Sequence, residues 1–279
     1  FPVTEQALAG SAAFAPPKRS GGIISWGDFH GGNNEEDSIL DYLVEYLRTG
    51  DATILLGVAP AVRHYCDIDV RHYNTDKRLE GGFLLHGHSV WGVNACHAYA
   101  EGPLLYALIT GEPRVREVVL RAGEAAINMR ETGEEPRGVA GRVCHDGAIQ
   151  GEICSRDDGR LLCVLTALFE ATGQDRFLEG AAQALDQMAR VQMPDGGWYT
   201  FTPAWIDEKI GFARTEDPLR ENVFNDTGPG INYIPLRGTA QFIQATAGLP
   251  AFKEERDKAI RVFLDALDFS IRTGMNPER

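Results

Sequence analysis

The chain has 279 residues, 43% apolar and 24% charged, a composition typical of globular proteins that bury a sizeable core. Its formal net charge of -13 argues against nucleic acid or an anionic membrane surface as a partner, since no Lys/Arg-rich run offers a basic patch. Five cysteines without CxxC spacing indicate neither a disulfide framework nor a structural zinc site, and no apolar run is long enough to span a membrane.

The beginning of the chain is predicted to be irregular. Residues 1–22, rich in proline and glycine, form a lead-in to a single domain over residues 23–279. A polar stretch then ends in acidic residues such as Asp37, which suit the start of a helix. From Ile39 onward, apolar residues keep helical spacing until Gly50, a glycine suited to the left-handed helix cap.

The same helix-ending signal recurs along the chain. A threonine closely followed by glycine ends an apolar segment at Thr49, Thr110, Thr172 and Thr246, which are 61, 62 and 74 residues apart. This loose internal repeat predicts a series of helical hairpins. The second helix of each hairpin is expected over 54–66, 115–129, 177–191 and 252–269.

The two helices of each predicted hairpin differ in composition. The first is apolar on all sides, as over 161–169, whereas the second has charges along one face, as over 114–124. An inner ring of buried helices surrounded by amphipathic ones explains this difference. We therefore predict an all-α fold, an α/α-toroid of about four or five hairpins that is an incomplete six-hairpin ring.

The connections between successive hairpins are long, at roughly residues 67–97, 130–157 and 192–233. Loops of this length are uncommon in compact domains unless they have a function. Because they leave from the same kind of helix end, we expect them to gather at one mouth of the toroid. The tight Thr-Gly turns are then expected at the other end.

The predicted mouth loops contain the residue types that a sugar site requires. Tryptophan and tyrosine stack on the apolar faces of a pyranose, while Asn, Asp, His and Arg pair with its hydroxyls. For Trp26 and Trp198 the alternative is a capping or core role. The candidate substrate-binding residues are Trp26, Asp28, Asp67, Asp69, Arg71, Asn94, Arg142, His145, Trp198, Asn225 and Tyr233.

The stretch 82–112 has the highest density of chemically reactive side chains, including three of the seven histidines. One interpretation is proton abstraction next to the carboxylate of a uronic acid, by a histidine or tyrosine and without a cofactor. A second is a metal held by His86, His88 and an aspartate at 67 or 69. A third is that the histidines only hydrogen-bond to backbone. The candidate catalytic residues are His86, His88, His97, Tyr99, Glu101 and Tyr73.

The third interpretation is weakest for His97, Tyr99 and Glu101, because ionisable side chains at the start of a buried helix are costly unless they are used. A glycoside hydrolase would instead need two carboxylates that flank the scissile bond. The sequence does not select that pair among its candidates, which are Asp28, Asp67, Asp69, Glu101, Glu152 and Asp226.

Three segments together resemble a known family. His64-Tyr-Cys-Asp-Ile-Asp-Val-Arg-His-Tyr73, then Gly82-x-x-x-His-Gly-His88, then His97-x-Tyr-x-Glu-Gly-Pro-Leu-Leu-Tyr-Ala-Leu-Ile-Thr-Gly-Glu112 resemble the helical toroid of bacterial glycan-degrading proteins of the exo-rhamnogalacturonan-lyase-like group. The resemblance covers roughly residues 26–132. It implies a carbohydrate substrate, an acidic polysaccharide, although related toroids include hydrolases, lyases and epimerases.

The sequence therefore predicts a polysaccharide-degrading enzyme, with β-elimination of a uronate-containing polysaccharide as the first hypothesis. A histidine at 86, 88 or 97 would be the base, Tyr99 or Tyr73 the acid, and Arg71, Arg142 and Asn94 the carboxylate binders. The alternatives are a hydrolase that uses two carboxylates, and a non-catalytic toroid that binds carbohydrate. In each case the expected partner is an oligo- or polysaccharide.

Overall fold

The structure is a computed structural model that describes residues 37–74, 77–84, 95, 98–131, 155–192, 194–198, 205–207, 212–214 and 229–274. The named elements among these residues are helices apart from one short antiparallel pair, in which β1 (Trp205–Asp207) lies beside β2 (Phe212–Arg214). The predicted all-α class is therefore confirmed. None of the described helices has the length and apolar composition needed to cross a bilayer.

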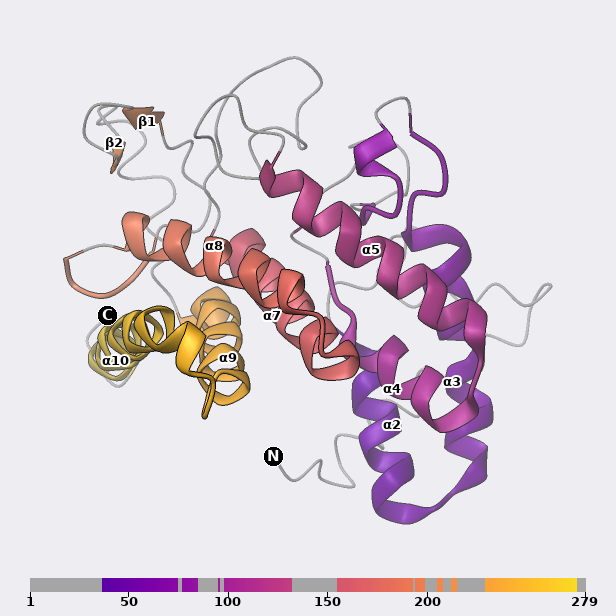
Figure 1. The fold of residues 1–279 in the computed structure, drawn as a ribbon. Coiled ribbons are helices and arrows are strands. Elements are labelled where there is room, and N and C mark those ends of the chain that lie inside the picture. Colours follow the sequence, from indigo (N-terminus) through magenta and orange to yellow (C-terminus); the bar gives the residue numbers. More distant parts are fainter. Residues whose placement is uncertain are drawn as a thin grey trace, which may run out of the picture.

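The described helices form four consecutive pairs joined by tight turns (Figure 1). The pairs are α2 (Ser38–Thr49) with α3 (Ala52–His64), α4 (Glu101–Thr110) with α5 (Pro113–Glu131), α7 (Ser155–Thr172) with α8 (Asp175–Val191), and α9 (Pro229–Ala245) with α10 (Lys253–Gly274). Three single turns accompany them: η1 (Tyr65–Asp69), η2 (Lys77–Leu79) and η3 (Pro250–Phe252). The predicted second helices thus lie within a few residues of their expected bounds.

Three of the four turns are built in the same way. At the first, Thr49 Oγ1 donates to the Glu45 carbonyl at 2.8 Å, and the Gly50 N–H donates to the Tyr46 carbonyl at 2.7 Å. Gly50 has a φ of 71°, the left-handed conformation that glycine adopts without steric cost. The turns at 110–111 and 172–173 repeat both bonds, whereas the fourth places its left-handed glycine one residue later, at Gly248.

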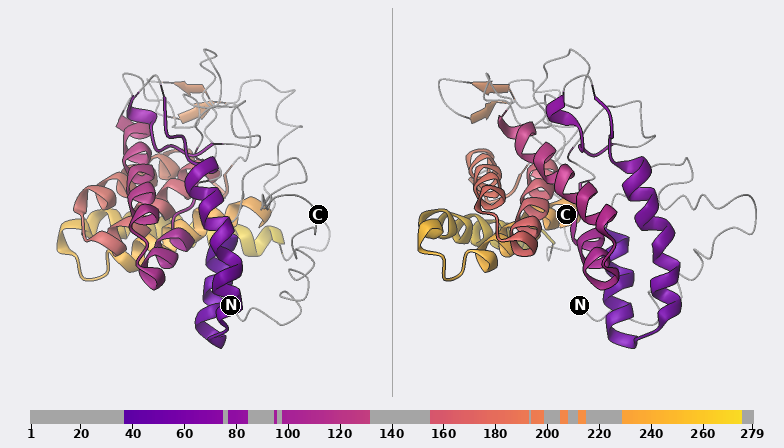
Figure 2. Two further views of the ribbon diagram at one scale, coloured as in Figure 1. Left: turned by 90° about the vertical axis from the view of Figure 1, so that its right-hand side faces the viewer. Right: turned by 45° about the vertical axis from the view of Figure 1, so that its right-hand side comes forward.

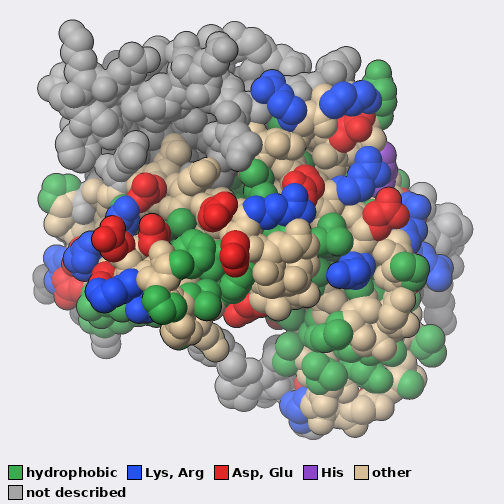
Figure 3. Space-filling model, in the orientation of Figure 1, with side chains coloured by type: hydrophobic (Ala, Val, Ile, Leu, Met, Phe, Trp, Pro, Cys, Tyr) green, Lys and Arg blue, Asp and Glu red, His purple; other side chains and the backbone are tan. Residues whose placement is uncertain are grey.

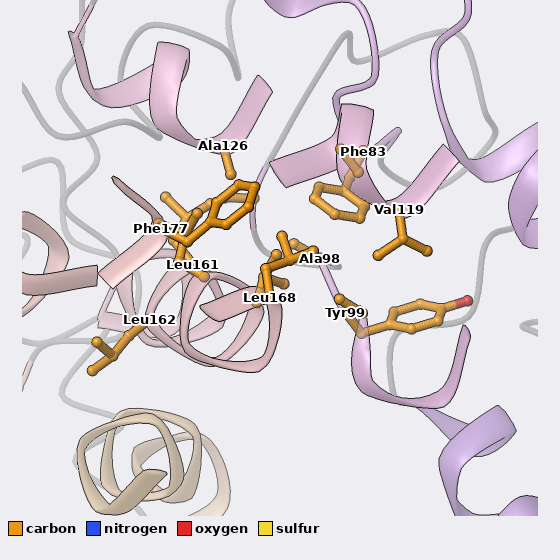
Figure 4. Packing of buried hydrophobic residues seen from close by; sticks show 14 of the residues in the cluster. Phe83, Ala98, Tyr99, Val119, Ala126, Leu161, Leu162, Leu168 and Phe177 are labelled. Carbon is orange, nitrogen blue, oxygen red and sulfur yellow. The ribbon is translucent and has the colours of Figure 1, made fainter. Parts of the chain in front are cut away.

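The first helices of the hairpins contact one another in chain order, α2 with α4, α4 with α7, and α7 with α9. On one side of them α5 contacts α8, and α8 contacts α10. Figure 2 shows that successive hairpins are also rotated relative to one another. In Figure 4, Leu161 and Leu168 of α7 meet Phe177 of α8 and Ala126 of α5 in the core that these helices share.

The first helices are not equally buried. In α7 the side chains over 158–168 are all buried, as predicted for an inner helix. In the first two hairpins, Leu47 of α2 and Leu108 of α4 are exposed, and Leu56 of α3 is exposed as well. Figure 3 shows these hairpins as a region where hydrophobic side chains gather on the surface. The predicted contrast between inner and outer helices therefore holds best for α7.

The second hairpin is oriented differently from the prediction. Arg114, just after the Thr110-Gly111 turn, pairs with Asp67 beyond the C-terminal end of α3. That end of the first hairpin is the one opposite its own Thr49-Gly50 turn. The tight turns therefore do not all lie at one end of the molecule. The reason is that α4 is only 10 residues long and begins beside the start of α2, so it crosses the first hairpin.

The segment after α3 is held by backbone bonds. Val70 and Phe83 form an isolated antiparallel bridge, and the Arg71 N–H donates to the Gly82 carbonyl at 2.9 Å. Gly81 adopts a φ of 94°, and a Cβ there would overlap the Arg121 carbonyl of α5. The start of the predicted 67–97 loop is thus a narrow paired loop that rests on α5.

Candidate functional site

The start of α4 is joined to the start of α2 by one buried carboxylate. Asp37 is the N-cap of α2, and its Oδ1 accepts the Leu40 N–H at 3.1 Å. Its Oδ2 accepts the Gly102 N–H of α4 at 2.7 Å. The Gly102 N–H lies in the first turn of α4, where N–H groups lack a partner within the helix, whereas the Leu40 N–H also donates to the Asp37 carbonyl at 3.0 Å. Asp37 therefore fixes where α4 begins, and with it the position of Glu101.

Glu101, the first residue of α4, is the centre of the described polar cluster. Its Oε1 accepts from Arg237 of α9 at 2.8 Å and also from the side-chain amide of Gln241. Its Oε2 has no partner among the described residues, and 15% of the side chain is exposed. One carboxylate oxygen is thus fixed by two donors, while the other has no donor within the described part of the chain.

All four first helices contribute to the surroundings of Glu101. Burial is the main cause that raises the pKa values of Asp37, the N-cap of α2, and of Cys163 and Glu170 of α7, and the negative charge of Glu101 raises each of them further. The α9 helix supplies the partners of Glu101, Arg237 and Gln241. The cluster therefore lies where the row of first helices converges.

The ionisable groups of this cluster have shifted pKa values for identifiable reasons. Burial, with a smaller effect of Glu101, raises the pKa of Asp37 to about 7, against the lowering effect of its backbone hydrogen bonds. Burial also raises the pKa of the Cys163 thiol to about 12, so this cysteine is protonated and is not a nucleophile at neutral pH. Partial burial, and then the charge of Glu101, raise the pKa of Glu170.

The predicted residues after α3 form a second group with their own partners. Asp69 is buried, and its Oδ2 lies 3.2 Å from His64 Nδ1. Asp67 is exposed and pairs with Arg114. Asp69 thus contacts His64 and Asp67 forms an ion pair with Arg114, and neither of these contacts involves Glu101.

Arg71 and Tyr73 continue this group. The backbone of Arg71 is fixed by its bonds to Gly81 and Gly82. The Tyr73 ring is 71% exposed, with Lys77 Nζ 4.3 Å from its centroid. Tyr73 is therefore available for stacking on a ligand, although the structure does not place it beside Glu101.

Tyr99 was predicted to be a catalytic residue, but the structure places it in the core. Its side chain is only 3% exposed, and its ring centroid lies 4.9 Å from that of Tyr65. Its carbonyl accepts a hydrogen bond from the Tyr65 hydroxyl at 3.0 Å. Figure 4 shows Tyr99 among buried side chains, with Phe83 and Val119 on the same side. Tyr99 therefore packs in the core and is not placed to act as an acid on a substrate.

Trp198 is likewise a core residue. It is 1% exposed, and its Nε1 donates to the Met188 carbonyl of α8 at 2.9 Å. The preceding Gly196 and Gly197 pack against α10, where a Cβ would overlap the Asp265 carbonyl or the Phe269 ring. The tryptophan thus fixes the end of α8, and no face of it is open for a sugar.

The remaining predicted residues divide into one that is described and many that are not. Tyr233 lies in the first half of α9 and is 39% exposed. Outside the described residues lie Trp26, Asp28, His86, His88, Asn94, His97, Arg142, His145 and Asn225. The metal hypothesis at His86 and His88 therefore remains a prediction. Among the described side chains, no group of three or more His, Cys, Asp or Glu is arranged to hold a metal ion.

Several residues of the cluster were not predicted as site residues. Asp37 was recognised only as a residue suited to start a helix, and Glu170 lies within an apolar helix that predicts core. Arg237 and Gln241 are 136 and 140 residues from Glu101 along the chain. No local pattern connects such distant positions, so only the packing of α9 against α4 could reveal them.

Comparisons of the chain with protein-family models, with curated proteins and with solved structures found no match.

Proposed function

We propose that the chain is a polysaccharide-degrading enzyme and that Glu101 is its central catalytic residue. The observation that supports this proposal is the asymmetric environment of the Glu101 carboxylate. Arg237 and Gln241 hold one oxygen, and the other has no hydrogen-bond partner among the described residues. Charge-assisted hydrogen bonds of this kind orient a carboxylate, and an oriented carboxylate with one open oxygen is suited to take a proton or attack a carbon.

The fold proposed with this function is an incomplete α/α-toroid related to the exo-rhamnogalacturonan-lyase-like group. The order of contacts among α2, α4, α7 and α9, with α5, α8 and α10 beside them, supports it. The crossed position of α4 is a departure from a regular ring. The resemblance over residues 26–132 supplies the substrate class, an acidic polysaccharide.

The first candidate reaction is β-elimination on a uronate. Glu101 Oε2 takes the proton from C5 of the uronate. The electron pair of the C5–H bond forms the C4–C5 double bond, and the C4–O bond breaks. The leaving oxygen takes a proton from an acid, for which His86, His88 and His97 are the candidates. Arg237 is one-third exposed and offers positive charge to the substrate carboxylate beside its bond to Glu101.

Glycoside hydrolysis is the second candidate, and Glu170 favours it. Glu170 is an exposed carboxyl whose pKa is raised by partial burial and by the charge of Glu101. A glycosidase needs two carboxyl groups, and one that is biased toward its protonated form is suited to the role of acid. In this reaction Glu101 would act as base or nucleophile and Glu170 as acid.

The test is incubation of the full chain with a panel of uronate-containing polysaccharides. Ultraviolet absorbance of a new C4–C5 double bond would support elimination, and reducing ends without that absorbance would support hydrolysis. Glu170→Gln separates the two further, because it should abolish hydrolysis and leave elimination largely unchanged. Binding of oligosaccharide without any turnover across the panel would contradict the enzyme proposal and favour the non-catalytic, carbohydrate-binding alternative.

A further inference from the structure

The Asp37 carboxylate is shared between two helix starts. Its two oxygens accept the N–H groups of Leu40 and Gly102, at 3.1 and 2.7 Å, from residues that are far apart in the chain. Asp37 is 5% exposed, so these bonds are shielded from water. Removing the carboxylate would leave first-turn donors of both α2 and α4 without a side-chain acceptor.

The contact with Gly102 leaves no room for another side chain. A Cβ on Gly102 would overlap Asp37 Oδ1, and it would also stand too close to the Leu40 nitrogen and to Ile39. The carboxylate therefore lies directly against the α4 backbone at the residue next to Glu101. Any movement of Asp37 is transmitted to the backbone of Glu101 through one peptide unit.

We infer that Asp37 is the positioning residue of the Glu101 site and that its ionisation regulates that site. The inference rests on the proposed role of Glu101. An ionised carboxylate accepts both N–H groups, whereas a protonated one presents an O–H donor to one of them. Protonation therefore weakens one of the two bonds by which Asp37 joins the start of α4 to the start of α2, and it removes a negative charge that faces Glu101.

The groups that face Asp37 come from three elements. Glu101 of α4 raises the pKa of Asp37, and Arg237 of α9 lowers it. The third group is the hydroxyl of Tyr65 of η1. Burial, and to a smaller extent the charge of Asp37, raise the pKa of this tyrosine well above its usual value, so it stays neutral. With burial as the main cause, the pKa of Asp37 rises to about 7, so the switch between the two forms falls in the neutral range.

The test is the pH dependence of the Gly102 amide resonance in the full chain, followed by two-dimensional NMR. In the wild type this resonance should titrate with a midpoint near 7, the value to which burial raises the Asp37 pKa. The titration should be absent in Asp37→Asn and unchanged in Asp51→Asn, which alters the exposed N-cap of α3. Glu101→Gln should move the midpoint downward, because the charge that raises it is gone.

A Gly102 resonance that does not titrate between about pH 5 and 8 would overturn the inference. So would a midpoint that is unaffected by Glu101→Gln, and this variant keeps the test valid even if Asp37→Asn fails to fold. Where turnover is observed, the pH profile should have a limb at the same midpoint that Asp37→Asn removes, whereas a purely structural cap would leave the profile unmoved. Absence of turnover contradicts the proposed function alone, since the NMR test requires no substrate.

Discussion

At the scale of single residues, the site combines what a local pattern can predict with what only packing reveals. Glu101 was predicted because it opens an apolar helix, where an unused carboxylate is costly. Arg237 was not, because nothing in its own helix marks it as the partner of a residue 136 positions away. Tyr99 and Trp198 show the opposite error, since their residue types suit a sugar site but both are buried.

Loss of the ion pair between Arg237 and Glu101 should lower turnover more than loss of an exposed Arg–Glu pair elsewhere. Arg237→Gln removes the cation that holds Glu101 Oε1. Turnover should then fall by about 10²-fold, because the Glu101 carboxylate is no longer held in position to act as a base. Arg176→Gln removes an exposed pair with Glu124 between α8 and α5 and should leave turnover unchanged. Steady-state kinetics of the two variants check this, and equal losses would contradict a special role for Arg237.

The two aspartate N-caps should respond to pH in opposite directions. Burial raises the pKa of Asp37 to about 7 in the folded state. As pH rises from about 4 to 7, the unfolded state therefore releases this proton before the folded state does, and the free energy of unfolding falls. Hydrogen bonds from Thr53 lower the pKa of Asp51, so its contribution is present above the unfolded pKa and is lost on acidification. Urea unfolding at several pH values should show the first slope vanish in Asp37→Asn and persist in Asp51→Asn.

At the scale of elements, the Thr-Gly turns were the most reliable signal in the sequence. Each turn depends on contacts within five residues, between a threonine hydroxyl, a carbonyl four residues earlier and a left-handed glycine. A short stretch of sequence is therefore enough to specify each turn. The orientation of α4 was not predictable, because it depends on the bond from Asp37 to Gly102, which spans 65 residues.

Two glycines in open surroundings should respond oppositely to alanine. Gly173→Ala introduces a Cβ at a φ of +66°, which should cost about 1 kcal/mol of unfolding free energy. Gly57→Ala, within α3 and with no atom near the new Cβ, should stabilise by roughly 0.5–1 kcal/mol. Denaturant unfolding of both variants checks the turn assignment, and a stabilising Gly173→Ala would contradict it.

At the scale of the whole molecule, the row of first helices is most completely buried at α7. Leu165 of α7 is fully buried, whereas Leu264 of α10 is 55% exposed. Leu165→Ala should therefore cost about 2–5 kcal/mol, and Leu264→Ala much less. Thermal or urea unfolding distinguishes the two, and equal costs would mean that α10 packs differently from the structure.

The all-α class and the hairpin series could be predicted from the sequence because helical periodicity and turn residues are local. The convergence of Asp37, Glu101, Glu170 and Arg237 could not, since these residues come from the N-cap of α2 and from three other helices, α4, α7 and α9. The residue types of the predicted site are therefore informative about chemistry, whereas their placement depends on long-range packing.

The most direct test of the central claim compares the two glutamates that bracket α4. Glu101 opens the helix within the polar cluster, and Glu112 follows its closing turn. On the best polysaccharide substrate, Glu101→Gln should lower kcat by about 10²-fold or more, and Glu112→Gln should leave it unchanged. Full turnover by a folded Glu101→Gln variant would contradict the claim that this carboxylate is the centre of the active site.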